Sequence, residues 1–317
     1  MFGLLTDSAF EASDRYFTLE NYEGGVARWC PSCGDHAVLS AVQRICRDEQ
    51  IPTEKIVAVS GIGCSSRFPH YIHAYGFHGL HGRALPVASG IRARRPDLHI
   101  WVATGDGDCC SIGAGHWLHA VRYNMNMTVM LFDNAVYGLT KNQTSPTSPV
   151  GLSTNTHPRG AWLPPLNILQ TTLGMTNASF VARTLDWNAL HLYQTLKAAH
   201  AHKGLSFVHI LQRCPTYTAD VFGELQKTPD RILLLKHERG VRVDDAVGRM
   251  YKNQLEHDPS DINEARALAE NADRVAVGLF YHNPKAPQYD EYTAQGLGWS
   301  AEDKIQALEK ELDRFAI

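Results

Sequence analysis

Short apolar runs alternate with helical patterns along most of the chain. Four runs rich in β-branched and apolar residues are typical of buried strands, and residues 179–183 form a fifth candidate. The four runs are 55–60, 99–104, 127–132 and 205–211. Between them, segments 36–48, 111–124 and 187–202 have the length or the spacing of helices. This alternation predicts an α/β fold, a mostly parallel sheet with helices on both faces.

Two stretches depart from this pattern. Residues 144–165 are rich in Pro, Ser, Thr and Gly, and a loop of that length usually carries function or lies against a partner. After residue 216 no strand alternation continues: 261–271 and 301–315 look helical and 284–292 looks extended. We therefore expect a domain over residues 1–217 and a C-terminal extension over 218–317, which packs on that domain or on a partner subunit.

Composition and charge exclude several classes of protein. Of the 317 residues, 44% are hydrophobic and 20% are charged, as in ordinary soluble domains. A net charge of -3 gives no sign of a nucleic-acid surface. No apolar run reaches the ~18–20 residues that a membrane span needs, and the first residues lack the pattern of a signal peptide. A cytoplasmic protein is the default expectation.

Polar motifs follow four of the predicted strands. Gly61-Ile62-Gly63-Cys64 follows the first and Gly105-Asp106-Gly107-Asp108 the second, while Asp133-Asn134 and Arg213-Cys214 follow the third and the last. In an open parallel sheet, ligands bind in the crevice beyond the carboxyl ends of the strands. The four motifs are therefore expected to converge on one site.

The second and third motifs suit a diphosphate with magnesium. Gly105 and Gly107 would let the backbone approach a phosphate, and a helix starting near Ser111 would direct N–H groups at it. Magnesium prefers hard oxygen ligands; the chain offers the Asp106 carboxylate, the Asn134 amide and the Val136 carbonyl.

This combination of a glycine motif and a later Asn resembles the cofactor motif of thiamin diphosphate enzymes. Taken alone, Gly-Asp-Gly could be a tight turn. A Rossmann dinucleotide site is the nearest rival, but Cys110 stands where its third glycine belongs.

Seven cysteines, an odd number, argue against a disulfide framework. Cys30 and Cys33 form a Cys-x-x-Cys pair, which alone suits a zinc half-site, a redox dithiol or part of a cluster site. No second close pair completes a zinc site. Cys64 and Cys214, however, follow strands that face the same crevice, and the four thiolates together suit an iron–sulfur cluster.

The motifs at 29–34, 60–67, 75–88 and 133–143 resemble the β subunit of 2-oxoacid:ferredoxin oxidoreductases, in the order that the family has them, over about residues 21–217. The resemblance implies a 4Fe-4S cluster on Cys30, Cys33, Cys64 and Cys214, and Mg²⁺ on Asp106, Asn134 and the Val136 carbonyl. It also implies thiamin diphosphate contacts from Ile62, Gly63, Cys64, Ser65, His81, Gly107, Asp108, Gly138 and Leu139. In one departure, Asn142 replaces a glycine of the family's Leu-Thr-Lys-Gly-Gln segment, which puts the shape of that loop in question.

The resemblance further implies a function. The enzyme would decarboxylate a 2-oxoacid oxidatively, giving the acyl group to coenzyme A and electrons, through the cluster, to ferredoxin. Lys141 is the best candidate to contact the substrate carboxylate. An α subunit would supply the activating glutamate and part of the substrate and coenzyme A site, in an αβ heterodimer or its dimer. The substrate expected is 2-oxoglutarate, with pyruvate or broad specificity as alternatives.

Two other functions stay open from the sequence. The chain could be a cluster-free thiamin diphosphate decarboxylase or synthase subunit, which would contain no iron. It could also be a zinc-stapled scaffold without catalysis, which would hold zinc and no thiamin diphosphate.

Overall fold

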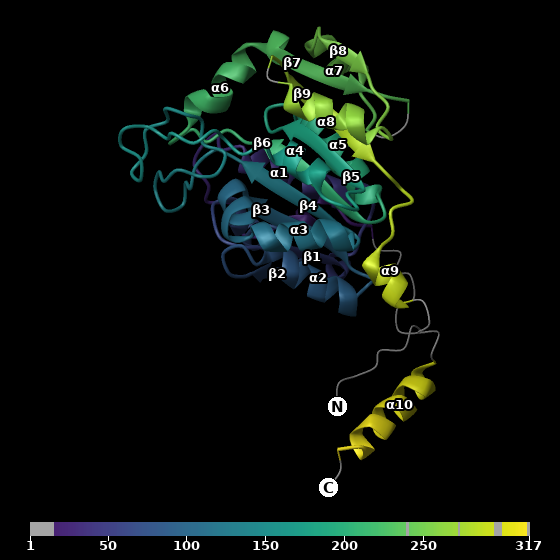
Figure 1. Cartoon of the computed structure of the whole chain (residues 1–317). Coiled ribbons are helices and arrows are strands. Elements are labelled where there is room, and N and C mark those ends of the chain that lie inside the picture. Colours follow the sequence, from purple (N-terminus) through teal and green to yellow (C-terminus); the bar gives the residue numbers. More distant parts are fainter. Residues whose placement is uncertain (1–15, 239–240, 272, 295–299, 316–317) are drawn as a thin grey trace.

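The computed structural model describes residues 16–238, 241–271, 273–294 and 300–315. Within them, nine strands form one sheet in the order β2-β1-β3-β4-β6-β5-β9-β7-β8 (Figure 1). Every neighbouring pair is parallel except β5 and β9. The strands are β1 Ile56–Ser60, β2 Tyr75–His78, β3 His99–Gly105, β4 Met127–Asp133, β5 Phe180–Leu185, β6 Leu205–Leu211, β7 Ile232–Lys236, β8 Gln254–Glu256 and β9 Val275–His282.

Helices cover both faces of this sheet. α2, α3, α4 and α8 contribute to the apolar core on one face, and α1 and α5 to the core on the other. A π-helical turn at Asp108–Ile112 comes directly before α3. The helices are α1 Asp35–Asp48, α2 Ala84–Arg94, α3 Ala114–Tyr123, α4 Ile168–Gly174, α5 Ala189–Ala201, α6 Ala219–Lys227, α7 Asp245–Met250, α8 Ile262–Glu270, α9 Tyr289–Ala294 and α10 Ala301–Asp313.

The two cores explain why the central strands are apolar throughout. Successive side chains of a strand point to opposite faces of the sheet. In β1, Val57 and Val59 join the core under α2 and α3, whereas Ile56 and Ala58 join the core under α1 and α5. A strand buried on both faces needs apolar residues at every position, so the predicted α/β fold with a mostly parallel sheet is confirmed.

The five predicted strands correspond to β1, β3, β4, β5 and β6. β2 was not predicted because it has four residues, all exposed, and therefore no buried face to mark it. The predicted loop at 144–165 contains no helix or strand.

The expectation that no strands follow residue 216 is wrong. β7, β8 and β9 extend the sheet, and β9 pairs antiparallel with β5. The sequence carried a signal for strands in two apolar runs, Ile232–Leu235 and 275–280. The helices expected near 261–271 and 301–315 are confirmed as α8 and α10, whereas 284–292, expected to be extended, runs into α9. The division of the chain at residue 217 stays a prediction.

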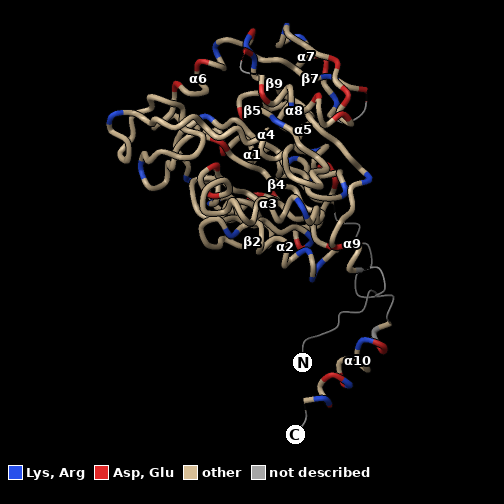
Figure 2. Tube along the Cα trace, viewed as in Figure 1, with Lys and Arg blue, Asp and Glu red and all other residues tan. Residues whose placement is uncertain are grey.

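Charged positions of both signs are scattered along the chain. In Figure 2, Lys and Arg are interspersed with Asp and Glu along the trace. No described helix is both long and apolar enough to cross a membrane.

Candidate functional site

A pocket lies at the carboxyl ends of β1, β3 and β4, where the polar motifs were expected to meet. All nine residues predicted to contact thiamin diphosphate line it, together with the three predicted magnesium ligands. Five further lining residues were not predicted: Gly105, Phe132, Tyr137, Thr140 and Gln212. The pocket holds about 100 Å³, less than the roughly 300–1,000 Å³ of sites that enclose a small ligand.

Asp108 holds two loops of the pocket together. Its Oδ1 accepts hydrogen bonds from the backbone N–H of Ile62 at 3.1 Å and of Gly82 at 2.7 Å, and contacts His81 Nδ1 at 2.5 Å. Its Oδ2 accepts from the Thr104 hydroxyl at 2.7 Å. Through these four contacts the Asp108 carboxylate orients the loop after β1 and the loop before α2. Asp108 and His81 lie side by side in the lining of the pocket.

Two of the glycines are required by neighbouring side chains. A Cβ on Gly107 would lie 2.1 Å from the Tyr137 ring, whose hydroxyl donates to the Gly107 carbonyl at 3.3 Å. A Cβ on Gly61 would lie 2.1 Å from Asp108 Oδ2. The expectation that Gly107 serves close approach of a phosphate is therefore incomplete, because Tyr137 already occupies the space next to it.

The predicted magnesium ligands lie where β3 and β4 end. Asp106 is 3% exposed, and burial together with the neighbouring Asp133 carboxylate raises the pKa of Asp106 above its ordinary value. Thr147 Oγ1 lies 2.6 Å from Asp106 Oδ2 and 2.7 Å from Asp133 Oδ1, so two buried carboxyl groups share one hydroxyl. A hydroxyl carries one proton, and a divalent cation at Asp106 would offset the excess negative charge.

A tight loop carries the other two predicted ligands. Asn134 Oδ1 accepts from the Val136 N–H at 3.2 Å, and Ala135 between them has a left-handed φ of 58°. The Ser148 hydroxyl donates to the Ala135 carbonyl at 2.7 Å, and the Thr218 hydroxyl donates to the Asn134 carbonyl at 2.8 Å. This donor set of carboxylate, amide and carbonyl fits Mg²⁺.

The four predicted cluster ligands come from three loops that touch. The Gly34 N–H donates to the Arg213 carbonyl at 3.2 Å, and Trp29 Nε1 donates to the Cys64 carbonyl at 2.6 Å. Burial, Asp35 and the thiols of Cys214 and Cys30 raise the pKa of Cys64 to about 12. Burial also raises the pKa of the Cys33 thiol, with smaller contributions from Asp35, Cys64 and Cys214.

Hydrogen-bond donors also reach two of these sulfurs. Gln212 Nε2 lies 3.3 Å from Cys33 Sγ, and the Thr216 hydroxyl lies 3.3 Å from Cys30 Sγ. All seven cysteines are free thiols. In the described part of the chain, no three His, Cys, Asp or Glu side chains are placed to hold a metal ion. Cysteine thiolates are the ligands that hold iron–sulfur clusters, so the chemistry of these four side chains fits such a group.

Lys141 is exposed and is not among the residues that line the pocket. Lys141 and Asn142 both have left-handed backbones, with φ of 72° and 65°. Asn tolerates that region better than most residues, so Asn142 adopts the turn that a glycine would make. The loop is tied down by Asn155, whose amide donates to the Lys141 carbonyl at 2.7 Å. The contact of Lys141 with a substrate stays a prediction.

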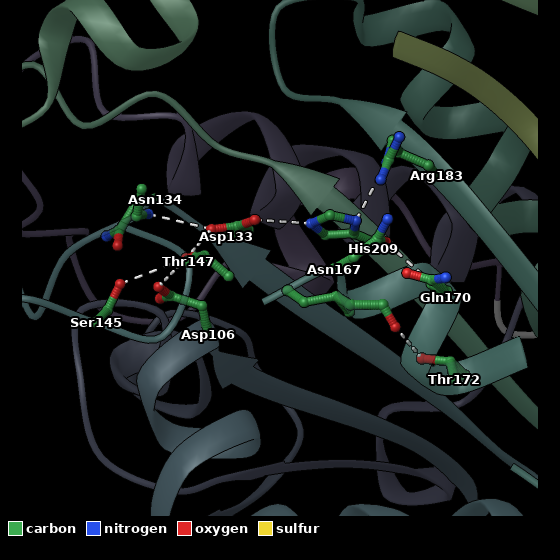
Figure 3. Close-up of polar contacts among 12 residues, drawn as sticks. Asp106, Asp133, Asn134, Ser145, Thr147, Asn167, Gln170, Thr172, Arg183 and His209 are labelled. Carbon is green, nitrogen blue, oxygen red and sulfur yellow. Dashed lines mark hydrogen bonds and ion pairs between the residues drawn. The ribbon is translucent and has the colours of Figure 1, made fainter. Parts of the chain in front are cut away.

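Sequence reasoning placed Asp133 in a polar motif but gave no role to it or to the other polar side chains behind the pocket. Asp133, Thr147, His209 and Arg183 form a connected row that starts at Asp106 (Figure 3). Thr147 belongs to the long loop that was expected to be functional, and its position in Ser-Pro-Thr-Ser was the available signal. His209 and Arg183 lie within apolar strands and gave none.

Comparisons with known proteins match this arrangement. Residues 61–210 match the family described as thiamine pyrophosphate enzyme, C-terminal TPP binding domain. Residues 247–296 match the family that describes the C-terminal part of the pyruvate ferredoxin oxidoreductase beta subunit. The 2-oxoglutarate oxidoreductase subunit KorB of Mycobacterium tuberculosis is 39% identical over 289 residues, covering 83% of this chain and 77% of the relative. Subunit beta of 2-oxoacid:ferredoxin oxidoreductase 2 of Aeropyrum pernix is 37% identical, covering 83% of this chain and 82% of the relative.

A solved structure is also similar. The 2-oxoglutarate:ferredoxin oxidoreductase of Magnetococcus marinus, with 2-oxoglutarate, coenzyme A and succinyl-CoA bound, superposes with a TM-score of 0.77 at 35% sequence identity. The match covers 92% of this chain and 96% of that chain.

Proposed function

The chain belongs to the β subunits of the 2-oxoacid:ferredoxin oxidoreductases, and we propose that it holds thiamin diphosphate, Mg²⁺ and a 4Fe-4S cluster in one crevice. The observation that carries the proposal is Cys64. It lines the cofactor pocket, and its thiol is close enough to those of Cys30, Cys33 and Cys214 to interact with them electrostatically. A 4Fe-4S cluster accepts one electron at a time, so the two electrons of the oxidation would leave in two successive transfers to a cluster close to the cofactor, and Cys64 joins the two sites.

Each group is assigned to residues of this chain. Mg²⁺ would be held by Asp106, Asn134 and the Val136 carbonyl, and the cluster by the four cysteines. Thiamin diphosphate would supply the carbanion that attacks the 2-oxo carbon and permits loss of CO₂. The chain's own contribution is to fix the loops: Asp108 orients His81 and the backbone of Ile62, while Tyr137 packs on Gly107.

The remaining parts of the reaction are assigned to partners. Within the described residues the chain has one α/β sheet, so we assign the glutamate that activates the cofactor, and part of the coenzyme A site, to an α subunit. Support comes from the small volume of the pocket and from exposed apolar side chains near it: Phe77, Leu80, Ile112 and Leu139 are 47%, 74%, 54% and 46% exposed. Ferredoxin would accept the electrons, and the acyl group would leave on coenzyme A.

We assign 2-oxoglutarate as the preferred substrate, with CO₂ and succinyl-CoA as products. The names of the Mycobacterium and Magnetococcus relatives support this assignment, whereas the Aeropyrum relative is named for 2-oxoacids in general. Turnover of the assembled enzyme with 2-oxoglutarate, pyruvate and 2-oxobutyrate, in the presence of coenzyme A and a one-electron acceptor, decides between them. Residues 218–317 are assigned as a C-terminal extension that adds β7, β8 and β9 to the sheet, and the cytoplasm as the location.

Metal analysis of anaerobically prepared αβ complex tests the cluster. We expect about four iron and four acid-labile sulfide attributable to this subunit, and their loss in Cys30→Ala. Zinc at one per chain without iron would point to the scaffold alternative. Bound thiamin diphosphate without iron or sulfide would point to a cluster-free decarboxylase or synthase.

A further inference from the structure

A row of hydrogen-bonded side chains leads away from Asp106 into the sheet (Figure 3). Thr147 Oγ1 lies 2.6 Å from Asp106 Oδ2 and 2.7 Å from Asp133 Oδ1. Asp133 Oδ2 lies 2.9 Å from His209 Nε2, and Arg183 Nε donates to His209 Nδ1 at 3.2 Å. The row therefore joins the ends of β3 and β4 to the interiors of β6 and β5.

Strand register explains how these side chains meet. Arg183 of β5 lies directly opposite His209 of β6, so the two side chains stand on the same face. On its other side, His209 is paired with Leu131 of β4, and Asp133 is two residues further along β4 on that same face. His209 thus bridges two strands from the centre of the sheet.

The direction of the hydrogen bonds follows from Arg183. A guanidinium donates and cannot accept, so His209 Nδ1 must be the acceptor and Nε2 carries the proton of the neutral ring. Burial lowers the pKa of His209, which keeps the ring neutral. Its Nε2–H then donates to Asp133 Oδ2.

Asp133 in turn fixes the loop that follows β4. Its Oδ1 accepts a hydrogen bond from the Ala135 N–H at 3.1 Å, and the Thr147 hydroxyl contacts the same oxygen. Asn134 and Val136 flank Ala135, so the carboxylate of Asp133 sets the backbone between the two loop ligands assigned to Mg²⁺. Through Thr147 it also sets the third, Asp106.

The row is buried and has a cation at its far end. Asp106, Asp133, Thr147 and His209 are each less than 9% exposed. Arg183 donates to the Ala276 carbonyl at 3.3 Å and lies over the Phe280 ring, 5.7 Å from its centroid. No carboxylate of the described residues forms an ion pair with Arg183, so its charge is balanced through His209 by Asp133.

We propose that Arg183 and His209 are positioning residues of the magnesium site, which orient Asp133 and Thr147 and thereby all three Mg²⁺ ligands. This inference rests on the proposed function, since it presumes that Mg²⁺ binds at Asp106. Groups behind metal ligands commonly change metal affinity by about 10–100-fold when they are removed. A role confined to tying β5 to β6 would change stability and leave the affinity for Mg²⁺ intact.

The test measures Mg²⁺ binding on the αβ complex stripped of thiamin diphosphate and Mg²⁺. Mg²⁺ is titrated at a fixed thiamin diphosphate concentration, and binding is followed by calorimetry; the melting temperature of the stripped complex is recorded separately. His209→Phe keeps a ring and removes both hydrogen bonds, whereas His209→Gln keeps a side-chain N–H donor for Asp133. Arg183→Met and Thr147→Val break the row at other points.

His191 supplies the matched control. It is equally buried, lies on α5 and contacts the Thr184 hydroxyl at 2.8 Å, with no link to the row. His191→Phe is expected to lower the melting temperature without changing the Mg²⁺ concentration needed for half-saturation. His209→Phe and Arg183→Met are expected to raise that half-saturating concentration at least about tenfold. His209→Gln is expected to have a half-saturating Mg²⁺ concentration close to that of the wild type.

If His209→Phe and Arg183→Met bind Mg²⁺ with the affinity of the wild type, the positioning role is wrong, whatever the melting temperatures of the two variants. Should His209→Phe fail to fold, Arg183→Met and Thr147→Val carry the same expectation. In the double variant His209→Phe/Thr147→Val, a connected row is expected to lose less Mg²⁺ affinity than the sum of the losses of the two single variants; full additivity contradicts a connected row. A wild-type complex that binds no Mg²⁺ with thiamin diphosphate would instead refute the proposed function.

Discussion

At the scale of single residues, Asp108 was predicted as a cofactor contact, and its carboxylate forms its hydrogen bonds with other groups of the protein. Its carboxylate gathers N–H groups from two loops and a hydroxyl from β3. The glycine requirement at Gly61 follows from it, because any side chain there would meet Asp108 Oδ2. The first glycine of the Gly-Ile-Gly motif is thus required by the close approach of Asp108, a contact that the motif alone does not reveal.

Gly61→Ala is expected to displace Asp108 and open the loop that carries His81. The unfolding free energy should fall by about 1–3 kcal/mol, the usual cost of overpacking, and thiamin diphosphate binding should weaken at least tenfold. Thermal unfolding and calorimetric titration of the αβ complex measure both effects. Gly90→Ala is the matched control: no atom beyond its own helix lies within 4 Å of its added Cβ, in the exposed interior of α2. It should raise stability by about 1 kcal/mol.

Lys141 is the second prediction at this scale. If its ammonium binds the substrate carboxylate, Lys141→Met should raise the KM for the 2-oxoacid about tenfold or more, since a hydrogen bond to a charged group contributes about 1.5–3 kcal/mol. Steady-state kinetics of the assembled enzyme, with coenzyme A saturating, measure this. Lys252→Met serves as control, because that side chain is 83% exposed in the C-terminal extension. An unchanged KM in Lys141→Met contradicts the assignment.

At the scale of elements, several buried histidines make the fold sensitive to acid. His191 of α5 is buried, and burial alone lowers its pKa to about 4 from an ordinary value of 6.5. The unfolded imidazole takes up its proton near pH 6.5, while the folded one stays neutral down to about pH 4. The unfolded state therefore binds more protons in this window, and stability falls as the pH decreases through it.

His191→Gln is expected to flatten this dependence. One such group contributes at most about 1.4 kcal/mol per pH unit, so the variant should lose less stability than the wild type between pH 6.5 and pH 4. Melting temperatures of the complex at half-unit intervals of pH measure the slopes. Equal slopes would show that His191 is not a source of the acid sensitivity.

The same scale shows what sequence could and could not predict. The convergence of Asp106, Asn134 and Cys64 on one pocket could be predicted because each follows an apolar run and the ends of parallel strands meet in space; their roles as ligands stay predictions. Arg183 and His209 were missed because their contact depends on β6 lying between β4 and β5, an order that local pattern does not determine. β9 has a local apolar signal, but its pairing with β5 could not be predicted because the two strands are far apart in the sequence. Local periodicity thus predicts elements, and the pairing of distant strands must come from the structure.

At the scale of the whole molecule, Leu139 of the pocket lining and Leu80, which precedes the pocket residue His81, are exposed apolar side chains. Leu80, beside His81, is 74% exposed. Leu80→Asp is expected to weaken association with the α subunit at least tenfold, because a charge would be buried without a partner at the interface. Size-exclusion chromatography and titration calorimetry of the two subunits measure the effect.

Met250→Asp is the control for this change, since Met250 is 55% exposed on α7, in the C-terminal extension. It should leave association unchanged. The purified chain alone should show no turnover with any 2-oxoacid. Turnover by the chain alone would contradict the assignment of the activating glutamate to the α subunit.

The antiparallel pair of β5 and β9 has a consequence for synthesis on the ribosome. β1, β3, β4 and β6, whose ends form the pocket, are all complete by Leu211, but β5 receives its second neighbour only when Val275–His282 has emerged. Between those points a nascent chain has its cofactor pocket in place and leaves one edge of β5 unpaired. Unpaired strand edges recruit other strands, so a chain truncated between β6 and β9 is expected to aggregate more readily than the full chain.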